Sequence, residues 1–171
     1  ANLRAAKDAD AVLVGPIAGD HRHVFDDVNH PKQGLIKLRA WLGSYATLRP
    51  IKGFGCLGGA SPLHANRSGP DLALVYDHSS GLFYGQPHGI EATSHGRIAT
   101  NTMIYTTGEV RRTVELACRI ARLRRRCVLS VDQAKALETG RLWAETADEV
   151  AKDFPDVQVT RRDALHFFYD L

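Results

Sequence analysis

Four consecutive polar side chains form the first set that could do chemistry. Asp77, His78, Ser79 and Ser80 follow one another directly, and a histidine titrates near neutral pH, so it can act as an acid or a base. The competing interpretation is a hydrogen-bonded turn between two strands, because neighbours in sequence need not share a face. We favour the turn, and in either case we expect His78 to border a pocket.

A second polar run could bind a metal ion. It contains Asp20, His21, His23, Asp26 and His30, and imidazole and carboxylate groups are common ligands of zinc. No second set of ligands with matching spacing accompanies them. We therefore interpret the run as a polar loop of an active site rather than as a zinc site.

The cysteines and the densest arginine cluster point to no further chemistry. The three cysteines, Cys56, Cys118 and Cys127, lack CxxC spacing, which favours reduced thiols in a cytoplasmic protein. Five arginines crowd into Arg119 to Arg126 without interleaved aromatic residues that could stack on bases. We interpret this cluster as the solvated face of a helix and expect no nucleic-acid partner.

Composition and hydrophobic pattern predict one soluble α/β domain over residues 1–171. Apolar residues make up 44% and charged residues 24% of the 171 positions, as in ordinary globular proteins. No apolar run approaches the roughly 20 residues that cross a bilayer, and the charged N-terminus does not look like a secretory signal. We therefore expect no membrane contact.

The elements that would position these side chains alternate between strands and helices. Strand patterns cover residues 9–17, 45–52, 71–77, 82–85, 98–105, 127–131 and 157–160. Helical patterns cover residues 2–7, the stretch from Pro31 to Gly43, and two long segments, Glu109 to Arg126 and Gln133 to Lys152. Thr106 with Glu109, and Ser130 with Gln133, form predicted capping boxes at the starts of the long helices.

Several long segments resemble a known family. They are LRAAKDADAVLVGPIAG, QGLIKLRAWLGSYATLRPIK, SPLHANRSGPDLALVYDHSSGLFYGQPHG, MIYTTGEVRRTVELACRIARLRRRCVLSVDQAKALETGRLW and VAKDFPDVQV. In order and spacing they resemble 3-isopropylmalate dehydrogenases, which belong to the metal-dependent β-decarboxylating dehydrogenases. The resemblance implies an α/β fold with a mixed sheet flanked by helices. It also implies a dimer-forming lobe, in which the two long helices pack across a two-fold axis.

The resemblance implies roles for three matching residues. Arg39 in LIKLR and Arg49 in TLRP match the arginines that clamp the substrate carboxylates, a task suited to planar guanidinium groups. Tyr105 in MIYTTGE matches the tyrosine that protonates the enolate left by decarboxylation. We expect the nearby arginines to lower the pKa of Tyr105 and so make it a better proton donor.

Other positions depart from the family pattern. Tyr76 stands in place of a third arginine, and Gln133 in place of the general-base lysine, where an amide cannot accept a proton. Lys135 is nearby, but on a helix two positions rotate a side chain by roughly 200°, so we expect it to line the pocket without replacing that lysine. Asp163 is the one weak candidate for a metal ligand, and a single carboxylate is a poor Mg²⁺ site.

These departures predict a repurposed protein. The chain matches neither the later metal aspartates nor the loops that bind NAD, so we expect a homodimer without cofactors that binds a small acidic or polyketide-like molecule. Any reaction would be non-redox: decarboxylation, isomerisation, elimination or cyclisation. The predicted pocket is lined by Arg39, Arg49, Tyr76, His78, Tyr105, Gln133 and Lys135. Two alternatives are a truncated NAD-dependent dehydrogenase, which nicotinamide binding would favour, and a non-catalytic dimerisation or regulatory module, which a filled pocket would favour.

Overall fold

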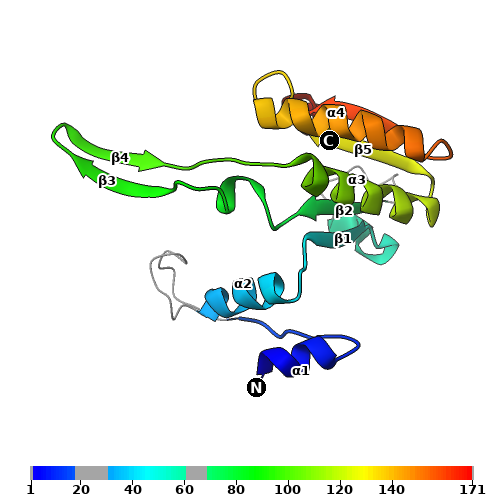
Figure 1. Ribbon diagram of the computed structural model, residues 1–171. Helices are drawn as coiled ribbons and strands as arrows, with labels where there is room; N and C mark the ends of the chain where they lie inside the picture. Colours follow the sequence, from blue (N-terminus) through cyan, green and yellow to red (C-terminus); the bar gives the residue numbers. More distant parts are fainter. Residues whose placement is uncertain (1, 18–30, 61–68, 171) are drawn as a thin grey trace. The chain divides into compact units, whose positions relative to one another are not determined.

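The computed structural model describes residues 2–17, 31–60 and 69–170 (Figure 1). The chain divides into two compact units, Ala1–Tyr45 and Ala46–Leu171. The predicted polar loop with Asp20 and its neighbouring histidines lies outside the described residues. The expectation of one domain over residues 1–171 stays a prediction.

The first unit is helical in its described part. Helix α1 spans Asn2–Asp8 and helix α2 spans Pro31–Trp41, close to the predicted bounds. The Lys7 ammonium lies 5.5 Å from the centroid of the Trp41 ring, a cation–π contact between the two helices. Gly43 takes a left-handed conformation with φ of 65°, which ends α2 where the sequence predicted a stop.

The predicted buried strand over residues 9–17 is wrong. Residues 11–17 have no regular secondary structure, and the Leu13 side chain is 99% exposed. A strand needs a neighbour to pair with its backbone N–H and C=O groups, and the described part of this unit contains no strand. The apolar pattern alone could not reveal that the neighbour was missing.

The second unit holds six strands among its described residues, arranged in three pairs. Strand β1 (Ala46–Lys52) runs antiparallel to β2 (Asp71–Asp77), and β3 (Gly89–Thr93) forms a hairpin with β4 (Gly96–Thr100). Strand β5 (Cys127–Asp132) runs parallel to β6 (Gln158–Asp163). The predicted α/β class with mixed pairing is confirmed, although the pairs do not merge into one sheet.

Two predicted strands of this unit need correction. Residues Gly81–Phe83 form a short 3₁₀ helix, η2, because the Tyr84 and Gly85 amides both donate to the Gly81 carbonyl. The strand predicted over residues 98–105 ends at Thr100 as β4, and its hairpin partner β3 was not predicted. A second 3₁₀ helix, η1, spans Gly55–Ala60.

Helix α3 (Thr107–Arg122) begins as its sequence predicts. The Thr106 hydroxyl accepts a hydrogen bond from the Glu109 amide at 3.3 Å, and the Glu109 carboxylate accepts one from the Thr106 amide at 2.8 Å. These reciprocal bonds complete a capping box, since each satisfies a donor that the helix itself leaves unpaired.

The second predicted capping box is wrong. Helix α4 spans Glu138–Asp153 and therefore begins five residues after Gln133, while Ser130 lies inside strand β5. The Ser130 hydroxyl accepts a hydrogen bond from the Trp143 indole at 3.1 Å instead. The Gln133 carbonyl accepts bonds from the Ala136 and Leu137 amides, so this stretch forms a turn.

Helices α3 and α4 pack against each other and form most of the core. Its buried residues come from α3, from α4 and from the segment that follows: Val110, Val114, Cys118, Ala121, Ala147, Val150, Phe154 and Val157. Strand β6 leads into α5 (Ala164–Asp170), which was not predicted. Ala147 is fully buried within its own chain. The predicted packing of the two long helices across a two-fold axis stays a prediction.

The arginine cluster after α3 is tied to acidic side chains. The Arg122 guanidinium donates to Asp156 with bonds of 2.6 to 3.2 Å, and Arg124 and Arg125 both form ion pairs with Asp71 at the start of β2. The Arg124 guanidinium is the main reason that the pKa of Asp71 lies below its ordinary value. These pairs fasten the end of α3 to neighbouring elements.

No helix among the described residues is long and apolar enough to cross a membrane.

Candidate active site

Tyr105 lies at the centre of the site, one residue before the N-cap of α3. Its ring meets the Trp143 ring of α4 edge to face, with centroids 5.7 Å apart and planes at 82°. On another side, a side chain added at Gly81 would overlap the Tyr105 hydroxyl. The phenol is therefore held between α4 and the η2 turn.

A hollow of about 380 Å³ opens beside Tyr105. Of the predicted site residues it brings together Tyr105, Tyr76 and Gln133. Most of the other lining side chains are apolar, with a few polar groups among them: Leu74, Val75, Met103, Thr113, Val114, Ala117, Val128, Leu129, Ser130, Val131, Asp132, Leu137, Thr139, Trp143 and Ala164. An apolar hollow with a few polar groups is the usual form of a small-molecule site.

The environment of Tyr105 overturns one prediction about its acidity. Burial raises the pKa of Tyr105, and the negative charges of Asp77 and Glu109 raise it further. We had predicted a pKa lowered by arginines, but the charges with the largest effect are carboxylates. The phenol consequently keeps its proton across the neutral pH range.

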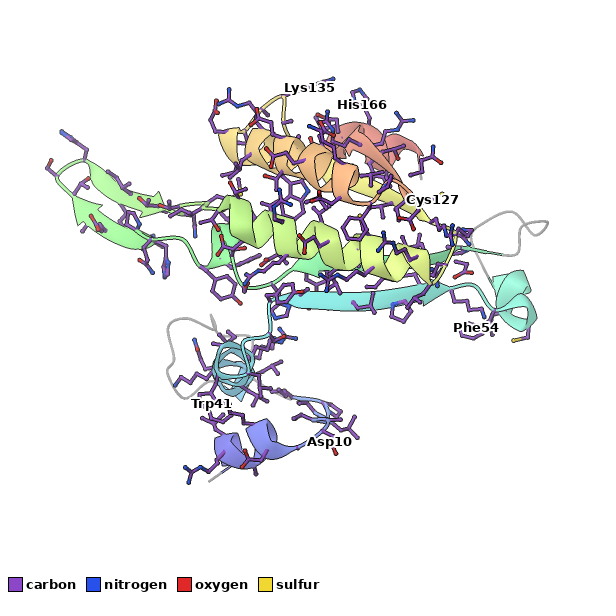
Figure 2. All side chains as sticks on the ribbon, turned by 45° about the vertical axis from the view of Figure 1, so that its right-hand side comes forward. Asp10, Trp41, Phe54, Cys127, Lys135 and His166 are labelled. Atoms are coloured by element: carbon purple, nitrogen blue, oxygen red, sulfur yellow. The ribbon has the colours of Figure 1, made fainter. Side chains whose placement is uncertain are left out.

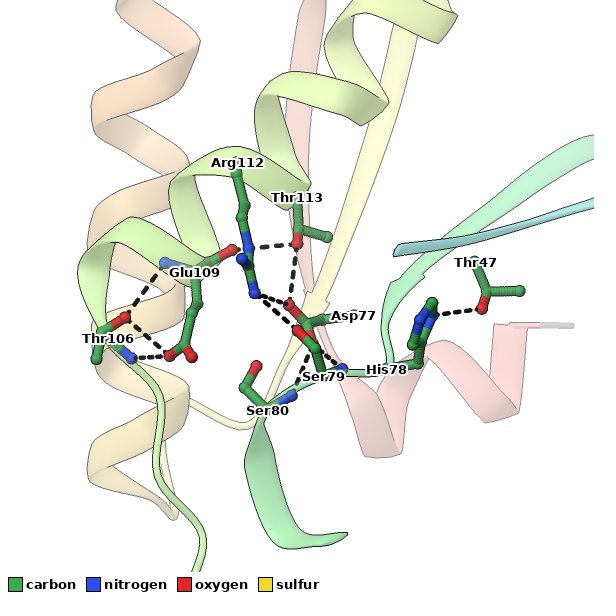
Figure 3. A network of polar contacts seen from close by, with 9 residues as sticks. All are labelled: Thr47, Asp77, His78, Ser79, Ser80, Thr106, Glu109, Arg112 and Thr113. Carbon is green, nitrogen blue, oxygen red and sulfur yellow. Dashed lines mark hydrogen bonds and ion pairs between the residues drawn. The ribbon is translucent and has the colours of Figure 1, made fainter. Parts of the chain in front are cut away.

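Asp77 anchors a network of hydrogen bonds next to Tyr105 (Figure 3). Its side chain is only 2% exposed, and its carboxylate accepts bonds from the Ser79 amide at 2.6 Å and the Ser80 amide at 2.9 Å. The Arg112 guanidinium of α3 lies 3.5 Å from the same carboxylate and donates to the Ser79 hydroxyl at 2.7 Å. Burial alone would raise the pKa of Asp77, but the bonds from Ser79 and Ser80 hold it below its ordinary value.

This network confirms the interpretation of residues 77–80 as a hydrogen-bonded turn. His78 points to strand β1, where its Nδ1 lies 2.7 Å from the Thr47 hydroxyl, and the described lining of the hollow does not include it. Its role as an acid or base stays a prediction. Sequence reasoning missed Arg112, Gly81 and Trp143, because only the folded chain brings them to Tyr105 and Asp77.

Arg49 lies in β1 next to Tyr76 in β2. Its guanidinium carbon is 5.4 Å from the centroid of the Tyr76 ring, which is a cation–π contact. The tyrosine that we predicted to stand in place of a third arginine therefore contacts Arg49. Arg49 is exposed and can reach an acidic ligand. Arg39 lies in α2 of the first unit, so the expected clamp of both arginines stays a prediction.

Lys135 and Asp163 lie at a different place from Tyr105. Both line an open hollow of about 580 Å³ together with Asp132, Ala134, Arg161, Arg162 and His166. Figure 2 shows Lys135 and His166 at the same end of the second unit. Lys135 and Gln133 lie in a turn and not on the predicted helix, so the expected rotation of roughly 200° between them does not apply. Gln133 lines the hollow at Tyr105, and Lys135 lines the other hollow.

The described residues do not by themselves fit the cofactors that the family resemblance implies. No group of three or more potential metal ligands occurs among them, and Asp163 has only Asp132 as its register partner at the ends of β5 and β6. A pyrophosphate favours a helix N-terminus free of negative charge, but α3 and α4 carry Glu109 and Glu138 in their first turns.

Comparison with known proteins identifies the family. A model of the isocitrate/isopropylmalate dehydrogenase family matches residues 1–164. The 3-isopropylmalate dehydrogenase of Nitratidesulfovibrio vulgaris is 41% identical over 162 residues, which are 94% of this chain and 45% of that protein. The enzyme of the same name from Aquifex aeolicus is 37% identical over 158 residues, which are 92% of this chain and 43% of that protein.

Two solved structures share the fold. The isocitrate dehydrogenase of Methylococcus capsulatus has a TM-score of 0.64 and 26% identity, over 88% of this chain and 40% of that one. A β-decarboxylating dehydrogenase of Thermococcus kodakarensis has a TM-score of 0.65 and 21% identity, over 99% of this chain and 44% of that one. The chain belongs to the isocitrate/isopropylmalate dehydrogenase family.

These relatives overturn the expected function. We had predicted a repurposed protein without cofactors and with lyase, isomerase or cyclase chemistry. Relatives at 37% to 41% identity over nearly the whole chain carry the name 3-isopropylmalate dehydrogenase, so the dehydrogenase alternative is better supported. The chain spans 43% to 46% of the length of the relatives it matches.

Proposed function

We propose that this chain forms the substrate-binding and dimer-forming part of an NAD-dependent dehydrogenase. The enzyme would oxidise and decarboxylate a 2-hydroxy dicarboxylic acid of the 3-isopropylmalate type. The observation that carries the proposal is the place of Tyr105, which lines an apolar hollow in a chain 41% identical to a 3-isopropylmalate dehydrogenase. The metal and dinucleotide sites of the enzyme would be completed outside the described residues.

The surroundings of Tyr105 suit a proton donor. Loss of carbon dioxide from a β-keto acid leaves an enolate, whose carbon must receive a proton. The O–H bond of Tyr105 would break as the new C–H bond forms, which leaves a phenolate to be reprotonated from solvent. Because its pKa is raised, Tyr105 holds that proton at neutral pH until the more basic enolate forms beside it.

The rest of the site suits the other parts of such a substrate. The apolar side chains along β2, β5 and α4, among them Leu74, Leu129 and Leu137, can receive a branched alkyl group. The exposed Arg49 guanidinium offers a charged partner for a carboxylate. Gln133 would offer an amide to a substrate oxygen but cannot act as the base.

We also propose that two copies of the chain associate through the β3–β4 hairpin. All ten of its residues are exposed, and Ile90 and Ile98 are 67% and 56% exposed. Figure 1 shows the hairpin extending away from helices α3 and α4. An isolated two-stranded hairpin is at best marginally stable in water, so contact with a second copy would stabilise it.

Calorimetric titration of the purified chain with 3-isopropylmalate tests the proposed substrate. We expect saturable binding that is tighter than the binding of malate, which lacks the alkyl group. Arg49→Ala should weaken binding by about tenfold or more, because a hydrogen bond to a charged group contributes about 1.5–3 kcal/mol. Arg119→Ala, at an exposed position of α3 outside the site and the hairpin, is the matched control. Equal binding by both variants, or no saturable binding by the wild type, would contradict the proposal.

A further inference from the structure

The Tyr105 hydroxyl lies directly against Gly81, at a position where only glycine leaves enough space. Gly81 has a φ of 80°, which is costly for any side chain, and a methyl group at this position would overlap the hydroxyl and ring of Tyr105. The Gly81 amide also donates to the Ile104 carbonyl at 3.0 Å, directly before Tyr105. The position of the phenol is therefore coupled to the backbone of the turn.

Asp77 binds both the turn that contains Gly81 and the helix that follows Tyr105. Its Oδ1 accepts the Ser79 and Ser80 amides, which shapes the turn that leads into Gly81. Its Oδ2 lies 3.5 Å from Arg112 and 3.4 Å from the Thr113 hydroxyl, so the same carboxylate is tied to the helix that follows Tyr105. Figure 3 shows these contacts converging on Asp77 from the turn and from α3.

The charges that face Tyr105 come from two elements. Strand β2 presents Asp77 and helix α3 presents Glu109, with Arg112 paired to Asp77. Helix α4 presents the uncharged Trp143 ring. Loss of the Asp77 charge would therefore leave Glu109 and burial as the influences that raise the pKa of the phenol.

We propose that Asp77 and Gly81 are positioning residues that hold the side chain of Tyr105 in place beside the hollow. This inference deepens the proposed function and rests on it for the role of Tyr105 as proton donor. Gly81 leaves the space that the hydroxyl occupies, and Asp77 locks the turn to α3. A displacement of the phenol of about 1 Å would be enough to lower turnover by roughly a hundredfold.

Tyrosine-ring NMR can test the part played by Asp77 without any enzyme assay. With tyrosines labelled at the carbon that bears the hydroxyl, Tyr105→Phe identifies the Tyr105 resonance. In Asp77→Asn we expect its titration midpoint to move to lower pH, because a neighbouring negative charge is lost. Asp71→Asn, at the other end of the same strand, removes the same charge and should leave the midpoint in place. An unchanged midpoint in folded Asp77→Asn would overturn the role of Asp77.

The part played by Gly81 has its own measurement. In Gly81→Ala we expect loss of the nuclear Overhauser contact between the Tyr105 and Trp143 rings, because the added methyl group displaces the phenol. Gly58→Ala is the control, since a side chain there meets open space. Retention of the contact in folded Gly81→Ala would overturn the role of Gly81. If Gly81→Ala does not fold, the contact between the Tyr105 and Trp143 rings is measured in Asp77→Asn, where its full retention would overturn the proposal. Both results are independent of isopropylmalate binding, so failure of the proposed function would be seen separately.

Discussion

At the scale of single residues, the site shows how one phenol can keep its proton at neutral pH. A strong acid would lose its proton to water before the substrate arrived. Tyr105 avoids this loss because burial and the charges of Asp77 and Glu109 disfavour the phenolate. Of the described arginines, Arg112 pairs with Asp77 and Arg49 lies over the Tyr76 ring. Tyr105 and Tyr76 therefore have different charged neighbours in this chain.

Tyr105→Phe should separate binding from chemistry. The ring, its contact with Trp143 and the apolar hollow all survive this change, so binding of 3-isopropylmalate should be nearly unchanged. Turnover by any assembly of this chain that oxidises 3-isopropylmalate should fall by roughly a hundred- to ten-thousandfold, because a positioned acid is lost. Calorimetry and reduced-nicotinamide absorbance measure the two effects. Full turnover by the variant would show that another group donates the proton.

Asp77 should make the stability of the protein sensitive to acid. Its pKa is lower in the folded state than its ordinary value of 3.8, so the folded state is favoured by its ionised form. That contribution is complete above the ordinary carboxyl range and is lost as the pH falls through the folded pKa. Urea unfolding of Asp77→Asn should show lower stability at neutral pH and a smaller loss on acidification. Asp8→Asn, on the exposed face of α1, controls for the loss of one charge.

At the scale of elements, the start of α3 supports the site because Tyr105 directly precedes it. Thr106→Ala should lower the free energy of unfolding by about 1 kcal/mol, because the Glu109 amide loses its partner at the N-cap. Thr107→Ala, one residue into the helix, makes the same chemical change at an exposed position and should have little effect. Thermal or urea unfolding followed by circular dichroism measures the difference. Equal losses in both variants would mean that the cap contributes nothing.

Local signals explain which elements could be predicted from sequence. The start of α3 was predicted because Thr106 and Glu109 form a complete capping signal within four residues. The same pattern at Ser130 and Gln133 misled, because Ser130 is committed to strand β5, opposite Arg161 of β6. The apolar run that contains Leu13 misled for a related reason, since burial depends on a partner and not on the run itself.

The candidate site was predictable only where a sequence pattern carried it. Tyr105, Tyr76 and Gln133 were found through family segments, and the structure places all three around one hollow. The link from Asp77 to Arg112 could not be found, because it joins a strand end to a helix through a contact between distant positions. The pKa of Tyr105 was predicted in the wrong direction for the same reason, since the neighbours that set it come from other elements.

At the scale of the whole molecule, the parts of the fold differ in how much of their apolar surface they bury within one chain. Helices α3 and α4 bury Val110, Val150 and Ala147 completely within one chain. The β3–β4 hairpin buries nothing, although it carries two isoleucines. Apolar side chains that stay exposed on a projecting element are typical of contact surfaces. We therefore propose association between copies at the hairpin, while the predicted packing of the two long helices across a two-fold axis stays a prediction.

Charged substitutions in the hairpin test this expectation. Ile90 and Ile98 lie on opposite faces of the hairpin, since Ile90 pairs with Ala99 and Ile98 pairs with Glu91. If a second copy covers both faces, Ile90→Glu and Ile98→Glu should each shift the mass measured by light scattering from dimer toward monomer, because a charge would have to be buried in the contact. Gln158→Glu adds the same charge at an exposed position of β6, outside the hairpin, and should leave the mass at that of a dimer. Monomer mass for the wild type at micromolar concentration would contradict the proposed association, and dimer mass for both isoleucine variants would place the contact elsewhere.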